Sequence, residues 1–128
     1  MEAGLEHLSW AGGTLRYVDL LLVVVEAQVK VLLTAERTIA LARQLGISTI
    51  GLVGNRVRPG DQAVLEAFAG DHGCELLALI PADDAIISAD QRGVCPVDLA
   101  PDSAAVAAIT ELAGVLETRF MAAASAAV

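Results

Sequence analysis

The feature that most limits how this chain can fold is an unbroken apolar run, Leu20 to Val25. Side chains along an extended strand alternate between its two faces, so a run without a polar residue predicts a strand covered on both sides. Such strands are typical of parallel sheets with helices on each face. The run is far shorter than the roughly 20 residues that a membrane helix requires.

Strand and helix patterns alternate along the rest of the chain. The predicted elements are a helix over Leu32 to Leu45 ended by Gly46, a strand over Ile47 to Val53, a helix capped by Asp61 and ended by His72 and Gly73, a strand over Glu75 to Ile80 stopped by Pro81, a helix over Ala82 to Gln91, and a helix over Ser103 to Phe120. The inward positions that this spacing predicts in the last three helices are Val64, Leu65 and Phe68, then Ile86 and Ile87, then Val106, Ile109, Ala113, Leu116 and Phe120.

This alternation predicts an α/β fold, a three-layer sandwich around a short parallel sheet with right-handed connections. At 128 residues the chain fits one domain, which we expect to span residues 1–120, followed by an Ala-rich tail at 121–128. The N-terminal stretch has no basic segment followed by an apolar one, so it does not resemble a signal peptide. We expect a soluble, cytoplasmic protein with no membrane insertion.

Charge and side-chain chemistry exclude several classes of function. Sixteen Asp and Glu face eight Lys and Arg, a net charge of -8, which disfavours nucleic acid as a partner. The two histidines, His7 and His72, have no second His or Cys at metal-ligand spacing. Cys74 and Cys95 form no CxxC motif, and we expect both to be small buried side chains. The sequence predicts neither a metal site nor a catalytic triad.

Polar residues follow each predicted strand, where ligands of parallel sheets bind. They are Glu26, then Asn55 with Arg56, then Pro81 to Asp84. The Asn55 carboxamide can both donate to and accept from a purine edge, and the backbone of Pro81, Ala82 and Asp83 can face the same ring. The alternative is that Asn55 takes a left-handed turn conformation and Asp83 only caps the next helix.

The chain does not contain the usual elements that hold nucleotide phosphates. No G-x-x-x-x-G-K-[ST] motif occurs in the 128 residues, and the single lysine, Lys30, has no glycine near it. Gly12 and Gly13 resemble a phosphate loop only weakly and are better interpreted as a turn. The residues alone therefore give no indication of a triphosphate site, and the purine site remains one of the two alternatives for Asn55 and Asp83.

Several segments in order resemble one known family. They are EAGLEH (residues 2–7), YVD before LLLVVVE (17–26), LTAER (33–37), GLVGNRV (51–57), IPADDAI (80–86) and D-x-x-G (90–93). Together they resemble the C-terminal half of a deviant-Walker P-loop ATPase of the MinD/ParA type. The most similar branch is that of the carbon monoxide dehydrogenase maturation ATPases, which support nickel insertion.

The resemblance implies the C-terminal half of a P-loop NTPase fold. It implies that Ala3 and Gly4 belong to the switch II segment that senses the γ-phosphate, and that Asn55, Arg56 and the loop from Pro81 to Asp83 surround adenine. ATP and Mg are the cofactors of the parent family. Its P-loop, lysines and magnesium-binding residue have no counterpart here, and Ala27 and Val31 stand where Pro and Ser are usual. We therefore expect no tight ATP binding and no catalysis by this chain alone.

A partial fold of this kind has a physical consequence at its first strand. In the complete fold that strand lies beside the P-loop strand, and without this neighbour it becomes an exposed apolar edge. We expect a homodimer that continues the sheet across the edge of residues 19–25, or pairing with a complementary N-terminal half. The remaining alternatives are a protein-interaction module and a small nucleotide-sensing domain that uses Asn55 and Pro81.

Overall fold

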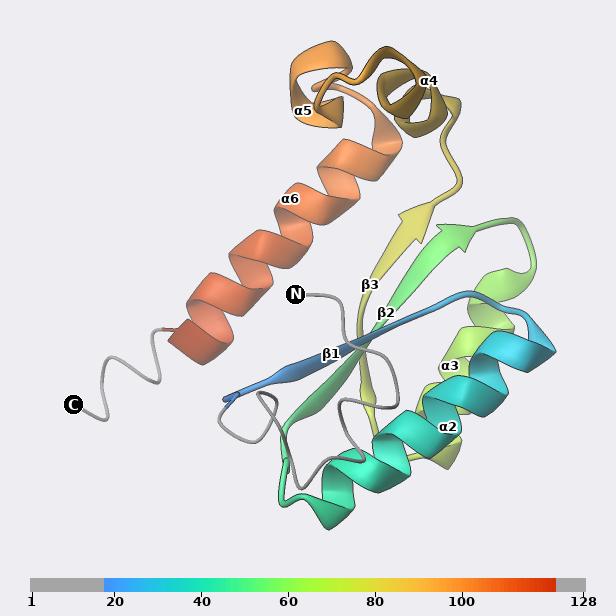
Figure 1. The fold of residues 1–128 in the computed structure, drawn as a ribbon, viewed down its shortest axis with the longest axis vertical. Coiled ribbons are helices and arrows are strands. Elements are labelled where there is room, and N and C mark those ends of the chain that lie inside the picture. Colours follow the sequence, from blue (N-terminus) through green and yellow to red (C-terminus); the bar gives the residue numbers. More distant parts are fainter. Residues whose placement is uncertain (1–17, 122–128) are drawn as a thin grey trace.

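The structure is a computed structural model that describes residues 18 to 121. Its centre is a three-stranded parallel sheet of β1 (Leu21–Val25), β2 (Ile50–Val57) and β3 (Glu75–Pro81), in the order β1-β2-β3. Helices α2 (Val29–Gln44) and α3 (Asp61–Asp71) lie on one side of the sheet, and α6 (Ala104–Leu116) lies on the other (Figure 1). The predicted α/β sandwich around a parallel sheet is confirmed.

Two short helices lie beyond the carboxyl end of β3. They are α4 (Asp84–Arg92) and α5 (Pro96–Leu99), which pack on each other apart from the sheet (Figure 1). Helix α6 continues into a π-helical turn, η2 (Glu117–Met121). The division into a domain over 1–120 and a tail over 121–128 stays a prediction, because residues 122–128 lie outside the described part.

The main core lies between the sheet and the pair α2 and α3. Val25, Ile39, Leu52 and Leu65 are almost completely buried there, and Ala42 is fully buried. These positions combine the inward face of α2 with alternate residues of β1 and β2, as the helical and strand periods require. The apolar pattern of the first strand and helix was therefore sufficient to predict this layer.

Glycines in β2 let its neighbours pack closely. A Cβ on Gly54 would lie 2.8 Å from Leu65 Cδ1 and 2.9 Å from Leu79 Cδ2. A Cβ on Gly51, on the opposite face, would lie 2.4 Å from Leu77 Cδ1. All three distances are too short for a real Cβ, so side chains of β3 and α3 occupy the space that glycine leaves.

Several predicted boundaries were wrong. The second strand begins at Ile50 instead of Ile47, because the Ile47 N–H donates to the Ala42 carbonyl and closes the end of α2. It also continues through Asn55 to Val57, where it pairs with Pro81 of β3. Asp61 is the first residue of α3 and not its N-cap, since Gly60 takes that position in a left-handed conformation with φ 93°. Its carboxylate instead accepts from the Arg58 N–H.

Some residues predicted to face inward are exposed. Val64, Ile87 and Ile109 all have more than a third of their surface open, and Ala113 is also exposed. Ile87 lies on α4, which has no sheet beneath it, so only Ala89 of that helix is buried. The helical period identified the apolar stripe of each helix. It did not show how much of that stripe is buried against the sheet.

Candidate functional site

The carboxyl ends of β2 and β3 meet at one rim of the sheet. Val57 pairs with Pro81, and the Ala82 N–H donates to the Val57 carbonyl at 3.0 Å. Asn55 lies two residues before Val57 in the same strand. The structure thus brings together the Asn55 and Pro81 segments that the sequence singled out, and both lie at the end of the sheet where α/β proteins bind ligands.

A bulge at the end of β2 shapes this rim. The pairing of β2 with β3 slips between Gly54 and Val57, so Asn55 and Arg56 fall in an irregular part of the ladder. Arg56 has φ 49° and is the non-glycine residue with a left-handed backbone among residues 18–121. The expected alternative for Asn55 was therefore wrong, because the left-handed position is Arg56. A bulge of this kind changes the direction of the neighbouring side chain.

An ion pair connects the bulge to the end of β1. Arg56 Nε donates to Glu26 Oε1, while Gln28 Nε2 donates to Glu26 Oε2 at 3.0 Å. The Glu26 side chain is only 17% exposed and Arg56 is 71% exposed. The hydrogen bond from Arg56 to Glu26, together with the carboxylate charge, raises the pKa of the Arg56 guanidinium. Glu26 thus links β1 to the strand that carries Asn55.

The Asn55 carboxamide has no partner comparable to that of Arg56. It is half-buried, and the side-chain hydrogen bonds of the described chain, residues 18 to 121, do not include it. An amide group in this position can offer two donors and an acceptor to a heterocyclic ring. Within residues 18 to 121, Asn55 therefore has an amide group without a side-chain hydrogen bond at the rim.

Asp83 has a different role from Asn55. One carboxylate oxygen accepts from the Ala85 N–H and the other from the Ala105 N–H, both at 3.0 Å. These hydrogen bonds, led by the one from Ala105, lower the pKa of the Asp83 carboxyl. The predicted alternative for Asp83, a helix cap, is confirmed, and it joins the first turns of α4 and α6.

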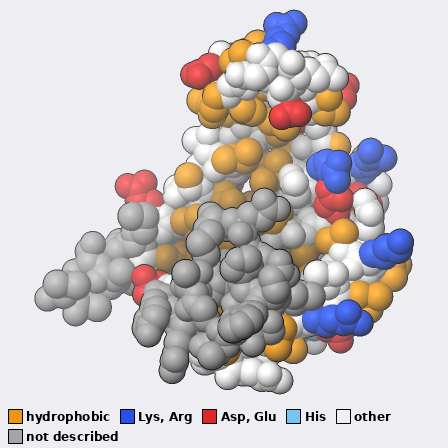
Figure 2. Space-filling view, viewed as in Figure 1, with side chains coloured by type: hydrophobic (Ala, Val, Ile, Leu, Met, Phe, Trp, Pro, Cys, Tyr) orange, Lys and Arg blue, Asp and Glu red, His pale blue; other side chains and the backbone are white. Residues whose placement is uncertain are grey.

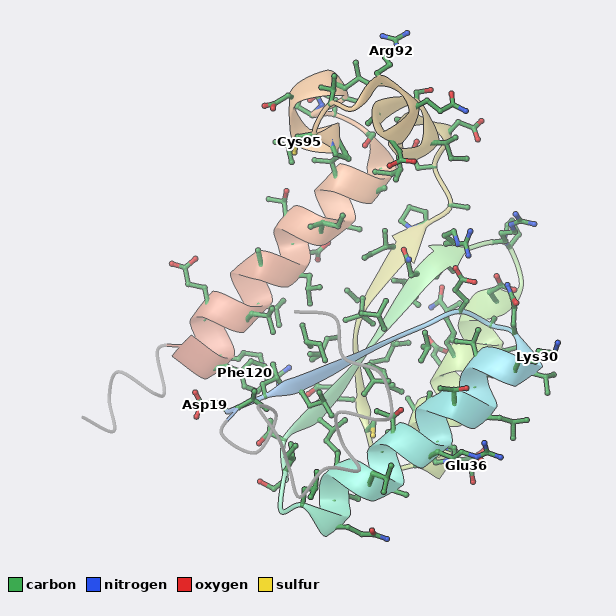
Figure 3. All side chains as sticks on the ribbon, viewed as in Figure 1. Asp19, Lys30, Glu36, Arg92, Cys95 and Phe120 are labelled. Atoms are coloured by element: carbon green, nitrogen blue, oxygen red, sulfur yellow. The ribbon has the colours of Figure 1, made fainter. Side chains whose placement is uncertain are left out.

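The remaining predicted site residues lie elsewhere or outside the described part. Ala3 and Gly4 belong to the segment before residue 18, so their role in nucleotide binding stays a prediction, as does that of Asn55, Arg56, Pro81, Ala82 and Asp83. Lys30 projects from the first turn of α2 (Figure 3). Within residues 18–121, no group of three or more His, Cys, Asp or Glu is close enough to hold a metal ion.

The two cysteines differ, which corrects one expectation. Cys74 is half-buried beside Arg43, and burial raises the pKa of its thiol while the charge of Arg43 opposes the rise. Cys95 is exposed, on the outlying α5 segment (Figure 3). It was predicted to be buried, but it immediately precedes Pro96 at the start of a four-residue helix away from the core.

Two contacts of this site were not predicted from the sequence. Glu26 was recognised as the residue after a strand, but its pairing with Arg56 joins positions 30 residues apart. The contact of Asp83 with Ala105 spans 22 residues. The apolar spacing over Ser103 to Phe120 predicted α6, but only the tertiary fold brings the start of that helix to Asp83.

Comparison with known proteins shows what this fold and rim resemble. No protein-family model matches the chain. It is 38% identical over 100 residues to an uncharacterised ATP-binding protein of Methanocaldococcus jannaschii, covering 77% of this chain and 38% of that protein. It is 42% identical over 102 residues to the carbon monoxide dehydrogenase accessory protein CooC of Rhodospirillum rubrum, covering 79% of this chain and 37% of CooC. The chain thus matches less than half the length of these relatives.

Solved structures share the fold. The MinD cell division protein of Aquifex aeolicus superposes with a TM-score of 0.71 at 22% identity, over 81% of this chain and 46% of MinD. MinD of Pyrococcus horikoshii, solved with Mg-ADP, gives a TM-score of 0.62 at 22% identity, over 84% of this chain and 44% of that one.

Sequence relatives and shared fold together identify the class: the chain corresponds to part of a MinD/ParA-type P-loop ATPase. Within that class it is related in sequence to the carbon monoxide dehydrogenase accessory protein CooC.

Proposed function

We propose that this chain supplies the base-binding side of an ATP site in a MinD/ParA-like ATPase. Asn55 and Arg56 from β2, with Pro81, Ala82 and Asp83 after β3, surround the adenine. The observation that carries the proposal is the bulge at the end of β2, which puts Asn55 in the irregular part of the ladder between Gly54 and Val57, next to the end of β3. Because the Ala82 N–H already donates to Val57 and Asp83 caps two helices, Asn55 makes the polar contact to the ring.

The phosphates are held by residues that these 128 positions do not include. The sequence has no P-loop motif, and a nucleotide loses most of its polar contacts when its phosphates are unbound. ATP with Mg, the cofactor pair of the class, binds this chain alone no better than about millimolar, and the chain alone does not turn ATP over. Ala3 and Gly4 act as the remnant of switch II. On this proposal the chain has the role of a truncated or split ATPase.

The client reaction we propose is carbon monoxide dehydrogenase maturation, including nickel insertion. The support is the 42% identity to CooC, whose name describes it as a carbon monoxide dehydrogenase accessory protein. Nickel is then cargo of the assembled system, and the described residues supply no ligand set for it.

Nuclear magnetic resonance of the labelled chain tests the adenine site. Adenosine should shift the amide signals of residues 54–57 and 80–83, and Asn55→Ala should abolish these shifts because it removes the ring contact. Gln62→Ala, an exposed amide on α3, is the matched control and should leave them unchanged. Adenosine shifts confined to other segments, Mg-ATP affinity in the micromolar range, or measurable single-chain turnover would each contradict the proposal.

A second candidate function rests on the outer edge of β1. The strand carries no charged residue, and Val24, which points to the face opposite Val23 and Val25, is 58% exposed. Among residues 18–121, β1 pairs with β2 on one side and with no strand on the other. We infer a homodimer, or a complex with a complementary N-terminal half, formed by continuing the sheet across this edge.

Light scattering after size exclusion tests the dimer. Wild type should elute as a dimer at micromolar concentration, and Val24→Lys should be monomeric because a lysine at the edge opposes pairing. Leu33→Lys, half-exposed on α2, adds the same charge away from the edge and should stay dimeric. A monomeric wild type that also fails to bind a separately expressed P-loop half would refute this function.

Within residues 18–121, no helix has the length and apolar character to cross a membrane.

A further inference from the structure

A groove of about 420 Å³ runs along β3. It is lined by four consecutive strand residues, Leu76 to Leu79, by Glu66 of α3 and by one stripe of α6 (Ala108, Glu111, Leu112 and Val115). Consecutive strand residues point to opposite faces, and α3 and α6 lie on opposite sides of the sheet (Figure 1). Since no residue of β2 lines it, the groove follows the edge of β3 that faces away from β2.

The backbone along this edge is available for pairing. In the described part of the chain, β3 is hydrogen-bonded to β2 alone, so its outer side presents N–H and C=O groups without a partner strand. Every residue from Leu76 to Pro81 is half-buried, whereas the first five residues of β2 are buried. The edge is thus walled by helices above and below but open along its length.

The charges around the groove are acidic on both walls. Glu66 and Glu111 are exposed, and the ion pairs found within residues 18–121 involve neither of them. Glu66 accepts only a neutral hydrogen bond, from Gln62 at 2.8 Å. On the face that Figure 2 shows, Lys and Arg side chains lie mainly on the side of β2 and α2, with one more at the outlying end near α4. A second copy of this chain, with net charge -8, would meet these walls unfavourably.

We propose that this groove binds an extended, apolar peptide segment that carries Lys or Arg, and that the segment adds to β3 as a fourth strand. Main-chain hydrogen bonds to β3 supply affinity, as in other cases of strand addition. Apolar side chains of the segment pack against Leu77, Leu112 and Val115, while its cations lie near Glu66 and Glu111. The site is separate from the adenine rim, so its failure would leave the proposed ATPase role untouched.

A synthetic peptide, acetylated and amidated KVTVKVT, is the probe. Titrated into the labelled 128-residue chain, it should bind saturably and slow amide hydrogen exchange within residues 76–80. The charge-reversed peptide EVTVEVT should bind at least about tenfold more weakly because of Glu66 and Glu111. KVTPKVT, in which proline removes a central N–H, should also bind at least about tenfold more weakly.

A pair of double variants separates the groove from general attraction to an acidic protein. Glu66→Lys with Glu111→Lys should weaken KVTVKVT about tenfold or more, while Asp90→Lys with Glu117→Lys, equally charged and exposed but outside the groove, should change it less than about twofold. Thermal unfolding of each variant verifies that it is folded. Protection of residues 21–25 instead of 76–80, equal weakening by both double variants, or absence of saturable binding would overturn the proposal.

Discussion

The two outer strands of the sheet, β1 and β3, are both edges of the described fold but have different surroundings. In β1 the exposure alternates, with Val23 and Val25 buried and Val24 58% exposed. In β3 every residue after Glu75 is half-buried, because α3 and α6 wall it on both faces. One edge is open and uncharged, while the other is a groove with acidic walls.

This difference indicates what each edge can accept. An uncharged apolar edge favours a like strand, such as that of a second copy, because the strand itself carries no like charges that would face each other. A groove flanked by Glu66 and Glu111 favours a guest of opposite charge. Two edges of one small sheet can thus serve different partners, and the selection comes from the helices around them rather than from the strands themselves.

The largest expected effect is on the strand that both edges share. Leu52 in β2 has no exposed surface. Leu52→Ala should lower the free energy of unfolding by about 2 to 5 kcal/mol, since it removes buried apolar atoms and leaves a cavity. Urea denaturation followed by circular dichroism measures this. Leu33→Ala, on the half-exposed face of α2, is the control and should change stability by less than about 1 kcal/mol. Similar losses for the two variants would mean that β2 is not the common core.

The next effect tests how tightly the β3 side of the sheet is packed, by adding a Cβ to a glycine of β2. Gly54→Ala should cost about 1 to 3 kcal/mol, because its Cβ would meet side chains of α3 and β3 at less than 3 Å. Gly70→Ala on α3 meets nothing within 4 Å and should be neutral or stabilising. Chemical denaturation of both measures the contrast. A tolerated Gly54→Ala would show that the β3 side is loosely packed and would weaken the description of its groove.

A smaller effect concerns Asp83, which joins α4 to α6 at the end of β3. Asp83→Ala should lower Tm by about 4 °C or more at pH 7, because two helix ends lose their acceptor. The folded pKa of this carboxyl lies below the unfolded value, so its contribution is present above the unfolded pKa and is lost as pH falls through the folded one.

Thermal melts as a function of pH check the sign. The difference in Tm between wild type and Asp83→Asn should shrink on acidification below about pH 4, the unfolded pKa of an aspartate. Asp98→Asn, on exposed α5, serves as the comparison for the loss of one surface carboxylate. A difference that grows on acidification would contradict the assigned role.

The smallest effect is at the start of β3. Arg119 of η2 donates two hydrogen bonds to Glu75, at 2.6 and 2.8 Å, and these lower the pKa of the Glu75 carboxyl. Both side chains are about half exposed, so solvent screens the pair. Arg119→Ala should shift Tm by less than about 2 °C, and the shift should disappear in 1 M salt. A large, salt-independent loss would mean that η2 anchors this edge.

Much of the fold followed from local patterns, whereas the site followed only in part. The unpatterned run before Val25 predicted a parallel strand, and the period through Ile39 predicted the helix that follows. The expectation that both faces of this strand are covered was wrong at Val24, which is 58% exposed. The rim that joins Asn55 to Pro81 was also expected, because parallel strands end at the same side. The left-handed Arg56 was not, because a bulge arises from the mismatch of two strands and leaves no local signature.

Burial of the peripheral helices shows the same limit. Ile87 has the spacing of an inward residue, but α4 lies beyond the sheet and leaves it 57% exposed. A helical period states which face is apolar, and it carries no information about whether a neighbour covers that face.

The sequence by itself determined the parallel α/β class, the order of the elements and the strand ends that carry polar residues. The class and the order follow from the repeat of apolar side chains, every two residues in a strand and every 3.6 in a helix. The common side of the strand ends follows from the parallel direction of the strands. Tertiary structure alone decided the Glu26 and Arg56 ion pair, the double cap at Asp83 and the acidic groove along β3. These depend on residues far apart in the chain, whose distance is fixed only when the helices pack on the sheet.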